Sequence, residues 1–153
     1  MSTFAALVAR LASFVGQEGT GVVDHAYACQ NRTFGVDADI TNAAVQITLV
    51  GKTPYLSKIT DGHFIPETGV AAAAASLSAR LFFDDGAGAG ATALSAIVDG
   101  TAVTTVSFQR ADFPTLVTAQ SIPVGSRIYA AITVNGAGAV WNDTQFEVEI
   151  AFD

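Results

Sequence analysis

Apolar and polar positions alternate most regularly near the C-terminal end of the chain. Every second residue is apolar from position 128 to 134 and again from 146 to 152, and the residues between them are mostly polar or small. A repeat of two places the apolar side chains on one face of an extended strand. Residues 127–134 and 145–152 are therefore expected to be half-buried strands, joined by a glycine-rich loop that contains Trp141.

The same repeat recurs in the middle of the chain, between glycine, proline and aspartate turns. Asp61-Gly62 and the hairpin signal Asp99-Gly100 are two of these turns. The strands expected from the pattern are residues 45–49, 55–59, 74–83 and 101–108, with 94–98 as either a short strand or a helical turn. This spacing predicts an all-β fold, a β-sandwich or jelly roll of about seven to nine antiparallel strands.

The first fifteen residues show helical spacing instead. Ser2 or Thr3 can cap a helix, and Gly16 suits its end. The apolar residues that would share one helical face are Phe4, Leu7, Val8, Leu11, Phe14 and Val15. A helix of about three to four turns is too short to be stable alone in water, so it is expected to pack on the domain, on a sister subunit or on a larger partner. A strand over residues 4–15 is the alternative.

A polar, turn-rich stretch follows the apolar start. Residues 17–42 contain Gly19, Gly21 and Gly35, with short strands conceivable around 22–23 and 33–36. Loops this long within a compact domain are uncommon, and most are functional or form arms. The expected organisation is an N-terminal apolar helix or arm with a linker in residues 1–42, followed by a β-sandwich domain in residues 43–153.

Composition narrows the functional classes. Hydrophobic residues make up 50% of the chain and charged residues only 14%, which favours a subunit that covers part of its surface against neighbours. The net charge is −7 and no cluster of Lys or Arg occurs, which argues against nucleic-acid binding and against docking on anionic membranes. The single Cys29 excludes an internal disulfide and favours a reducing compartment. Residues 1–15 lack a basic start, so no signal peptide is expected.

Residues able to carry catalysis are sparse. His25 and His63 are the only histidines, and His63 is expected to be solvated in the Asp61-Gly62 turn. Glu147 and Glu149 should point to the same side of one strand, which suits a soluble sheet face better than the opposed carboxylates of a glycosidase. The nucleophile-elbow, P-loop and dinucleotide-binding motifs are all missing. The sequence therefore predicts a protein that is not an enzyme, with no catalytic residue, cofactor or metal site.

Two weaker candidates for ligand binding remain. Trp141 lies beside Asn142 in the predicted glycine-rich loop, where an exposed ring can stack on a sugar, although capping the open end of the sandwich is preferred. The acids at 84–85, with Asp37 and Asp39, are oxygen donors of the kind that Ca²⁺ takes, although solvated turn acids are preferred.

The sequence resembles one group of proteins in the order of its turns, strands and glycine-rich loops. The run Ser-Ile-Pro-Val-Gly-Ser-Arg-Ile at residues 121–128, followed by a strand, a glycine-rich loop and a terminal alternating strand, resembles the end of bacteriophage virion β-domains. Such domains occur in capsid decoration or cement proteins and in head-fibre and tail-fibre modules. The strand at 77–83 and the Asp-Asp-Gly that follows it are similar to the central strands of these domains. The resemblance covers residues 43–153.

This resemblance implies a non-enzymatic virion structural protein, in first place a capsid decoration or cement protein that binds and stabilises the capsid lattice. Its partners would be the major capsid protein or other virion proteins. It would be a homo-oligomer, with a trimer preferred, located on the capsid surface and assembled in the bacterial cytoplasm. The apolar face in residues 4–15 is the expected partner contact. A receptor- or carbohydrate-binding module of a phage fibre, with Trp141 as its stacking residue, is the alternative.

Overall fold

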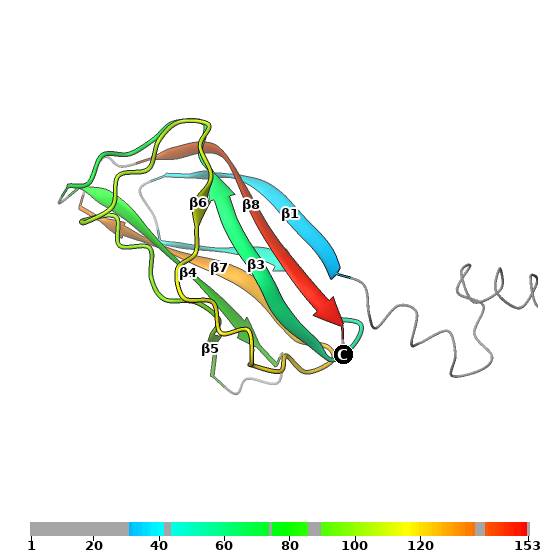
Figure 1. The fold of residues 1–153 in the computed structure, drawn as a ribbon. Helices are drawn as coiled ribbons and strands as arrows, with labels where there is room; N and C mark the ends of the chain where they lie inside the picture. Colours follow the sequence, from blue (N-terminus) through cyan, green and yellow to red (C-terminus); the bar gives the residue numbers. More distant parts are fainter. Residues whose placement is uncertain (1–30, 42–43, 74, 86–89, 137–139, 153) are drawn as a thin grey trace, which may run out of the picture.

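The computed structural model describes residues 31–41, 44–73, 75–85, 90–136 and 140–152 (Figure 1). These ranges form eight strands and contain no helix, and hence none long and apolar enough to span a membrane. The strands are β1 (Asn31–Ile40), β2 (Val45–Val50), β3 (Ser57–Ile65), β4 (Ser76–Asp84), β5 (Thr92–Ala93), β6 (Ala111–Asp112), β7 (Arg127–Asn135) and β8 (Trp141–Phe152).

The eight strands form two four-stranded antiparallel sheets. The β8 sheet has the order β1-β8-β3-β6, and the β7 sheet has the order β2-β7-β4-β5. The antiparallel pairs β1·β8, β2·β7, β3·β6 and β4·β5 join strands that are progressively closer in sequence. A long antiparallel ribbon wrapped into two facing sheets has this strand order, which is that of a jelly roll. The predicted all-β sandwich is confirmed.

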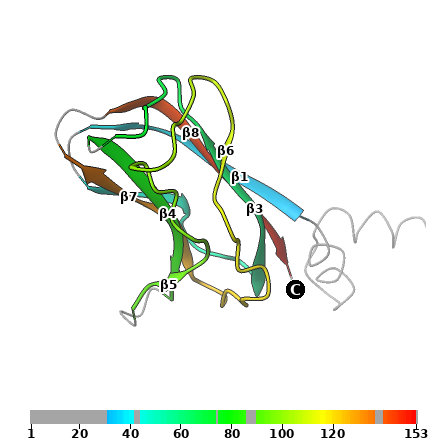
Figure 2. The ribbon, with the colours of Figure 1, turned by 60° about the vertical axis from the view of Figure 1, so that its left-hand side comes forward.

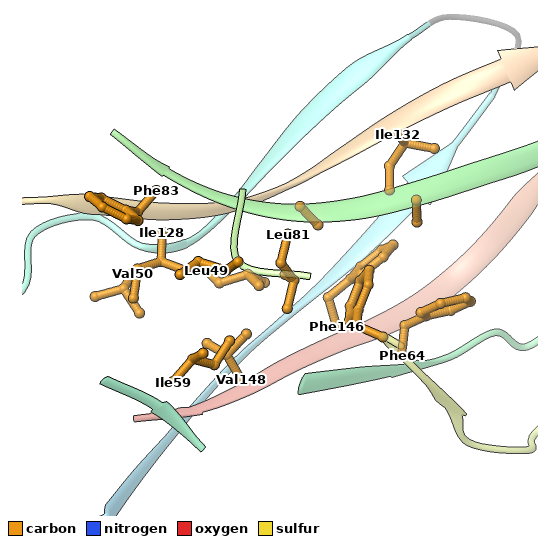
Figure 3. Close-up of a cluster of buried hydrophobic side chains, with 14 of the residues drawn as sticks. Leu49, Val50, Ile59, Phe64, Leu81, Phe83, Ile128, Ile132, Phe146 and Val148 are labelled. Atoms are coloured by element: carbon orange, nitrogen blue, oxygen red, sulfur yellow. The ribbon is translucent and has the colours of Figure 1, made fainter. Parts of the chain in front are cut away.

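The core lies between the two sheets. The apolar positions of β8 at 146, 148, 150 and 152 are all buried, as the alternation predicts. Figure 3 shows Phe146 and Val148 from the β8 sheet facing Leu81 and Ile132 from the β7 sheet. Full burial of one such side chain contributes roughly 1.5–3 kcal/mol. The period-two pattern therefore identified the side chains that hold the sheets together.

The expected linker is wrong for residues 31–40, which form β1. This strand pairs with β8 from Asn31 opposite Ala151 to Ile40 opposite Trp141. It lies at the edge of its sheet, and its alternate residues Phe34, Val36, Ala38 and Ile40 face the core while Gly35, Asp37 and Asp39 are exposed. The domain boundary at residue 42 is therefore displaced towards the N-terminus. Residues 1–30, with the expected N-terminal helix, lie outside the described residues.

Several expected turns and strands also differ from the structure. Gly62 lies inside β3 rather than in a turn, and a Cβ there would lie 2.7 Å from Leu81 Cδ1 of the facing sheet. Glycine thus allows the two sheets to approach closely at this point. The expected turn at Ala111 is β6, which pairs with the end of β3. The expected strand or helical turn at 94–98 is replaced by the short β5, followed by a single bridge between Val98 and Ala79.

Candidate functional site

The register of the β8 sheet aligns polar side chains in rows across the strands. In the central row, Gly35 lies opposite Glu147, Glu147 opposite His63, and His63 opposite Asp112. The rows on either side are Thr33, Glu149 and Asp61, and Asp37, Gln145 and Ile65. Because these rows bring acids from all four strands onto one face, they are the natural place to look for a charged site.

His63 is the centre of this face and is almost enclosed. It is only 9% exposed, in contrast to the solvated turn position that the sequence predicts. Its Nδ1 lies 3.2 Å from Asp61 Oδ2 and its Nε2 lies 3.4 Å from Glu147 Oε2. One carboxylate oxygen therefore lies beside each ring nitrogen of His63.

Arg110 holds the Asp61 side of this cluster. Its Nη2 donates to Asp61 Oδ1 at 2.7 Å and to Oδ2 at 2.9 Å, and its Nε donates to Asp112. Burial acts to raise the pKa of Asp61, but the charge and hydrogen bonds of Arg110, with smaller help from the Gly62 amide and His63, lower this pKa overall. The hydrogen bond to Asp112 in turn raises the pKa of Arg110. The cluster ties β3 to β6 and β8.

Asp61→Asn is expected to destabilise the fold in a pH-dependent way. A lowered pKa means that ionised Asp61 stabilises the folded state above the ordinary value of 3.8, and that this stabilisation is lost as the pH falls through the folded-state pKa. Since the pair is partly exposed, the free energy of unfolding should fall by about 0.2–1 kcal/mol at neutral pH. Urea unfolding at a series of pH values below 3.8 should show the difference shrinking as the pH falls. Glu67→Gln, the matched control, should stay within about 0.5 kcal/mol of the parent at each of these pH values.

The acids considered for Ca²⁺ are not brought together. Asp84 Oδ2 accepts from Arg127 Nη2 at 2.6 Å in the β7 sheet, whereas Asp37 and Asp39 lie on β1 of the other sheet. Within the described ranges, no group of three or more His, Cys, Asp or Glu side chains is arranged to hold a metal ion.

Trp141 is part of the core and not of an exposed loop, so its predicted role in stacking on a ligand is wrong. It is the first residue of β8 and is 0% exposed. Its ring centroid lies 4.8 Å from that of Phe64 and 6.5 Å from that of Phe146. A sugar cannot reach this ring while the sheets are packed. Any aromatic contact with a ligand must come from another residue.

The expected partner contact in residues 4–15 cannot be compared with the structure. Phe4, Leu7, Val8, Leu11, Phe14 and Val15 all lie outside the described residues. The chain enters the described part at Asn31, opposite Ala151 near the end of β8. The role of this apolar face in partner binding stays a prediction.

A segment between β5 and β6, residues 101–108, runs outside the two sheets as a loop with a turn at each end (Figure 2). We call it the strap. It is not the expected strand. Two backbone hydrogen bonds, from the Thr105 amide to the Val70 carbonyl and from the Phe108 amide to the Pro66 carbonyl, tie it to residues 66–70, and side-chain hydroxyls add further bonds. The hydroxyl oxygens of Ser107, Thr105 and Thr104 each accept a hydrogen bond of 2.9 Å from the backbone amides of Gly69, Val70 and Ala72, respectively. Hydroxyl groups that bond backbone in this way compete with regular secondary structure.

The inward hydroxyls leave the large apolar side chains of the strap facing outward. Val103 and Val106 are each 47% exposed and Phe108 is 73% exposed. We call these three residues the apolar ridge. Phe108 also has a backbone φ of +55°, which is uncommon for a bulky residue and stores roughly 1–3 kcal/mol of strain. The strap thus holds an aromatic ring in solvent against its own conformational preference.

A groove of about 300 Å³ lies beside the ridge. Its lining comes from four separate segments of the chain, which supply Asp37, Ile65 with Glu67, Phe108, and Asp143 with Gln145. The Asp143 amide donates to Asp39 Oδ1 at 2.8 Å, which fixes this part of β8 against β1. Sequence reasoning missed the groove because its residues are far apart in the chain. The sequence signal that could have indicated the groove is the set of acidic residues at the outward positions of strands whose apolar residues alternate.

Comparison with solved structures gives four distant matches, two of which are described here. No known protein family and no curated protein matches the chain. A structure of infectious bursal disease virus, Gt strain, covers 79% of this chain and 32% of its own, with a TM-score of 0.43 and 11% identity. A structure of the Gx strain covers 80% and 33%, with a TM-score of 0.40 and 16% identity. The chain spans about one third of the length of those chains. The strand order described above, and not this likeness, is the basis of the fold assignment.

Proposed function

We propose that the protein is a non-enzymatic structural component of a virion, of the decoration or cement type, which binds and stabilises the capsid lattice. The observation that carries the proposal is the apolar ridge at Val103, Val106 and Phe108. Three large apolar side chains are exposed within six residues of one segment, and exposed apolar surface of this kind marks interaction sites. The jelly roll is a fold used by viral capsid domains and lectins, but the fold alone does not decide between them. The resemblance of residues 121–128 to phage virion domains favours the first.

The arrangement of the strap explains why a partner is needed. Threonine and serine hydroxyls satisfy backbone amides on the inner side, so the strap gains its hydrogen bonds without burying its apolar side chains. Covering these side chains would recover roughly 25 cal/mol for each Å² of apolar surface removed from water. A specific interface buries roughly 800 Å² per partner, and many copies on one lattice add through multivalency.

The remaining features of the proposal concern assembly. We place a second contact in the N-terminal segment that contains Phe4, Leu7, Val8, Leu11, Phe14 and Val15. A homo-oligomer, with a trimer preferred, would sit at a local symmetry axis of the capsid surface. Native mass measurement of the purified chain determines the oligomer number.

Phe108→Asn is expected to weaken capsid binding and leave the fold intact. Asparagine tolerates the positive φ at this position, and the removed ring is 73% exposed, so stability should change by no more than about 0.5 kcal/mol. Loss of a central aromatic contact should weaken binding by about tenfold or more. The measurement is co-sedimentation with empty capsids assembled from the major capsid protein encoded beside this gene.

Val124→Asn is the matched control, because Val124 is 63% exposed and lies outside the strap. It should bind capsids as the parent does. A chain lacking residues 1–16 should stay folded by circular dichroism and bind less. If the parent fails to bind capsids, or if no capsid gene lies beside this one, the virion role is wrong.

The alternative function is a receptor- or carbohydrate-binding module of a phage fibre. The groove beside the exposed Phe108 ring is the observation that favours it, since Trp141 is buried. Binding on a glycan array that is lost in Phe108→Asn would select this function.

A further inference from the structure

We propose that the groove beside the apolar ridge receives a lysine or arginine side chain of a partner protein, presented on a segment whose neighbouring side chains are apolar. The inference deepens the proposed function and rests on it only for the partner's identity. The groove and the ridge share Phe108, so a single bound segment would cover both.

The charge of the groove favours a cation. Asp37, Glu67 and Asp143 line the same space of about 300 Å³. None of the three forms an ion pair with a basic side chain in the described part of the chain. Carboxylates that line one concave site favour a bound cation over a neutral or anionic group. The rest of the sheet face is different, because Arg110 already neutralises Asp61 and Asp112 there.

The other lining residues suit a long cationic side chain. Lysine and arginine have an apolar stem, which can pack on Ile65, and a charged head, which can lie against the Phe108 ring. Gln145 donates its amide to Glu147 Oε1 at 2.6 Å, which leaves the oxygen of the Gln145 side chain as a further acceptor. Arginine uses several acceptors at once because its donors form a planar fork.

A second copy of this chain is a poor occupant. Of the basic side chains in the described residues, Arg80 donates to the Ser95 carbonyl, and Arg110 and Arg127 form ion pairs. Arg32 and Lys58 also have partners, so Lys52 is the one described basic residue left to offer. Each copy carries a net charge of −7, so two acidic faces repel each other. A partner of different composition is therefore favoured.

The test is an NMR titration of the full ¹⁵N-labelled chain with two tripeptides. The probe is acetyl-Leu-Arg-Leu-amide, and its neutral counterpart replaces arginine by citrulline, which has nearly the same shape. The arginine peptide should shift the amide signals of the groove residues Asp37, Glu67, Phe108 and Asp143. It should bind about tenfold more tightly than the citrulline peptide, and its affinity should fall with added salt. Equal affinity for the two peptides, or shifts confined to other parts of the sandwich, would overturn the proposal.

Variants separate the groove from a general effect of charge. Asp143→Asn keeps a residue type that tolerates the φ of +37° at this position, and Glu67→Gln keeps the size of its side chain. Each variant should lower the affinity for the arginine peptide by about threefold or more. Glu149→Gln is the matched control, since it removes the same charge from the same strand outside the groove lining. If Glu149→Gln weakens binding as much as Asp143→Asn, the groove is not the site.

Two further outcomes would also overturn the proposal. One is that a neutral oligosaccharide shifts the groove signals and the arginine peptide does not, in which case the groove holds a glycan. The other is that these signals move with protein concentration alone, in which case a second copy fills it. The peptide assay contains no capsid, so its failure is distinct from failure of the virion role. Capsid binding without peptide binding would contradict the groove proposal only. Peptide binding without capsid binding would contradict the virion role only.

Discussion

Trp141→Ala is expected to lower the free energy of unfolding by about 3–5 kcal/mol. The indole is 0% exposed and packs on Phe64 and Phe146, so its removal loses the transfer free energy of a large ring and leaves a cavity between the sheets. Single domains have a total stability of only about 5–15 kcal/mol, so this change removes a large part of it.

Urea unfolding followed by circular dichroism is the suitable measurement, because the chain has a single tryptophan and the variant loses its fluorescence. Val124→Ala, at a position that is 63% exposed, is the control and should stay within about 0.5 kcal/mol. Trp141→Phe should be milder, since Nε1 of Trp141 is buried without a hydrogen-bond partner among the described residues and phenylalanine removes that donor. A loss below about 1 kcal/mol for Trp141→Ala would contradict the buried position.

Gly100→Ala is expected to destabilise the fold by about 3 kcal/mol or more. A Cβ at this position would lie 1.8 Å from the carbonyl oxygen of Leu77 and 2.6 Å from its carbonyl carbon, both of which are backbone atoms of β4. The turn would have to move away from β4. Such a movement breaks the hydrogen bond from the Gly100 amide to Ser78 Oγ and strains the bridge between Val98 and Ala79.

The same unfolding measurement tests this change, with Gly51→Ala as the control. A Cβ at Gly51 meets no atom within 4 Å. Alanine there should leave stability unchanged or raise it by about 0.4–1 kcal/mol, because it restricts the unfolded chain. If Gly100→Ala is as stable as Gly51→Ala, then the Asp99-Gly100 turn does not lie against β4.

The strands that the sequence predicted best are the central ones. β7 and β8 are each flanked by strands on both sides and present one face to the core, so burial selects apolar residues at alternate positions. β1 shows the same alternation at Phe34, Val36, Ala38 and Ile40. Gly35 and the aspartates between these residues, together with the polar run before them, made the segment resemble a linker. The strap was expected to be a strand, but its apolar residues Val103, Val106 and Phe108 are exposed.

The sites were harder to predict than the strands. His63 is two residues from Asp61, but its contact with Glu147 depends on how β3 aligns with β8. Trp141 was assigned to an exposed loop because the chain around it is rich in glycine, yet β8 begins at this residue and its ring lies in the core. The groove draws on four segments that are far apart in the chain, so no local sequence pattern predicts it.

The sequence by itself determined that the chain is an all-β sandwich and which side chains of β7 and β8 fill it, because a two-residue repeat is a local property. Tertiary structure alone decided the jelly-roll order, the enclosure of His63 between two carboxylates, the burial of Trp141 and the outward apolar ridge. These features depend on which strands lie side by side and in what register. Loop closure and packing of the whole chain set that register, and no single segment determines it.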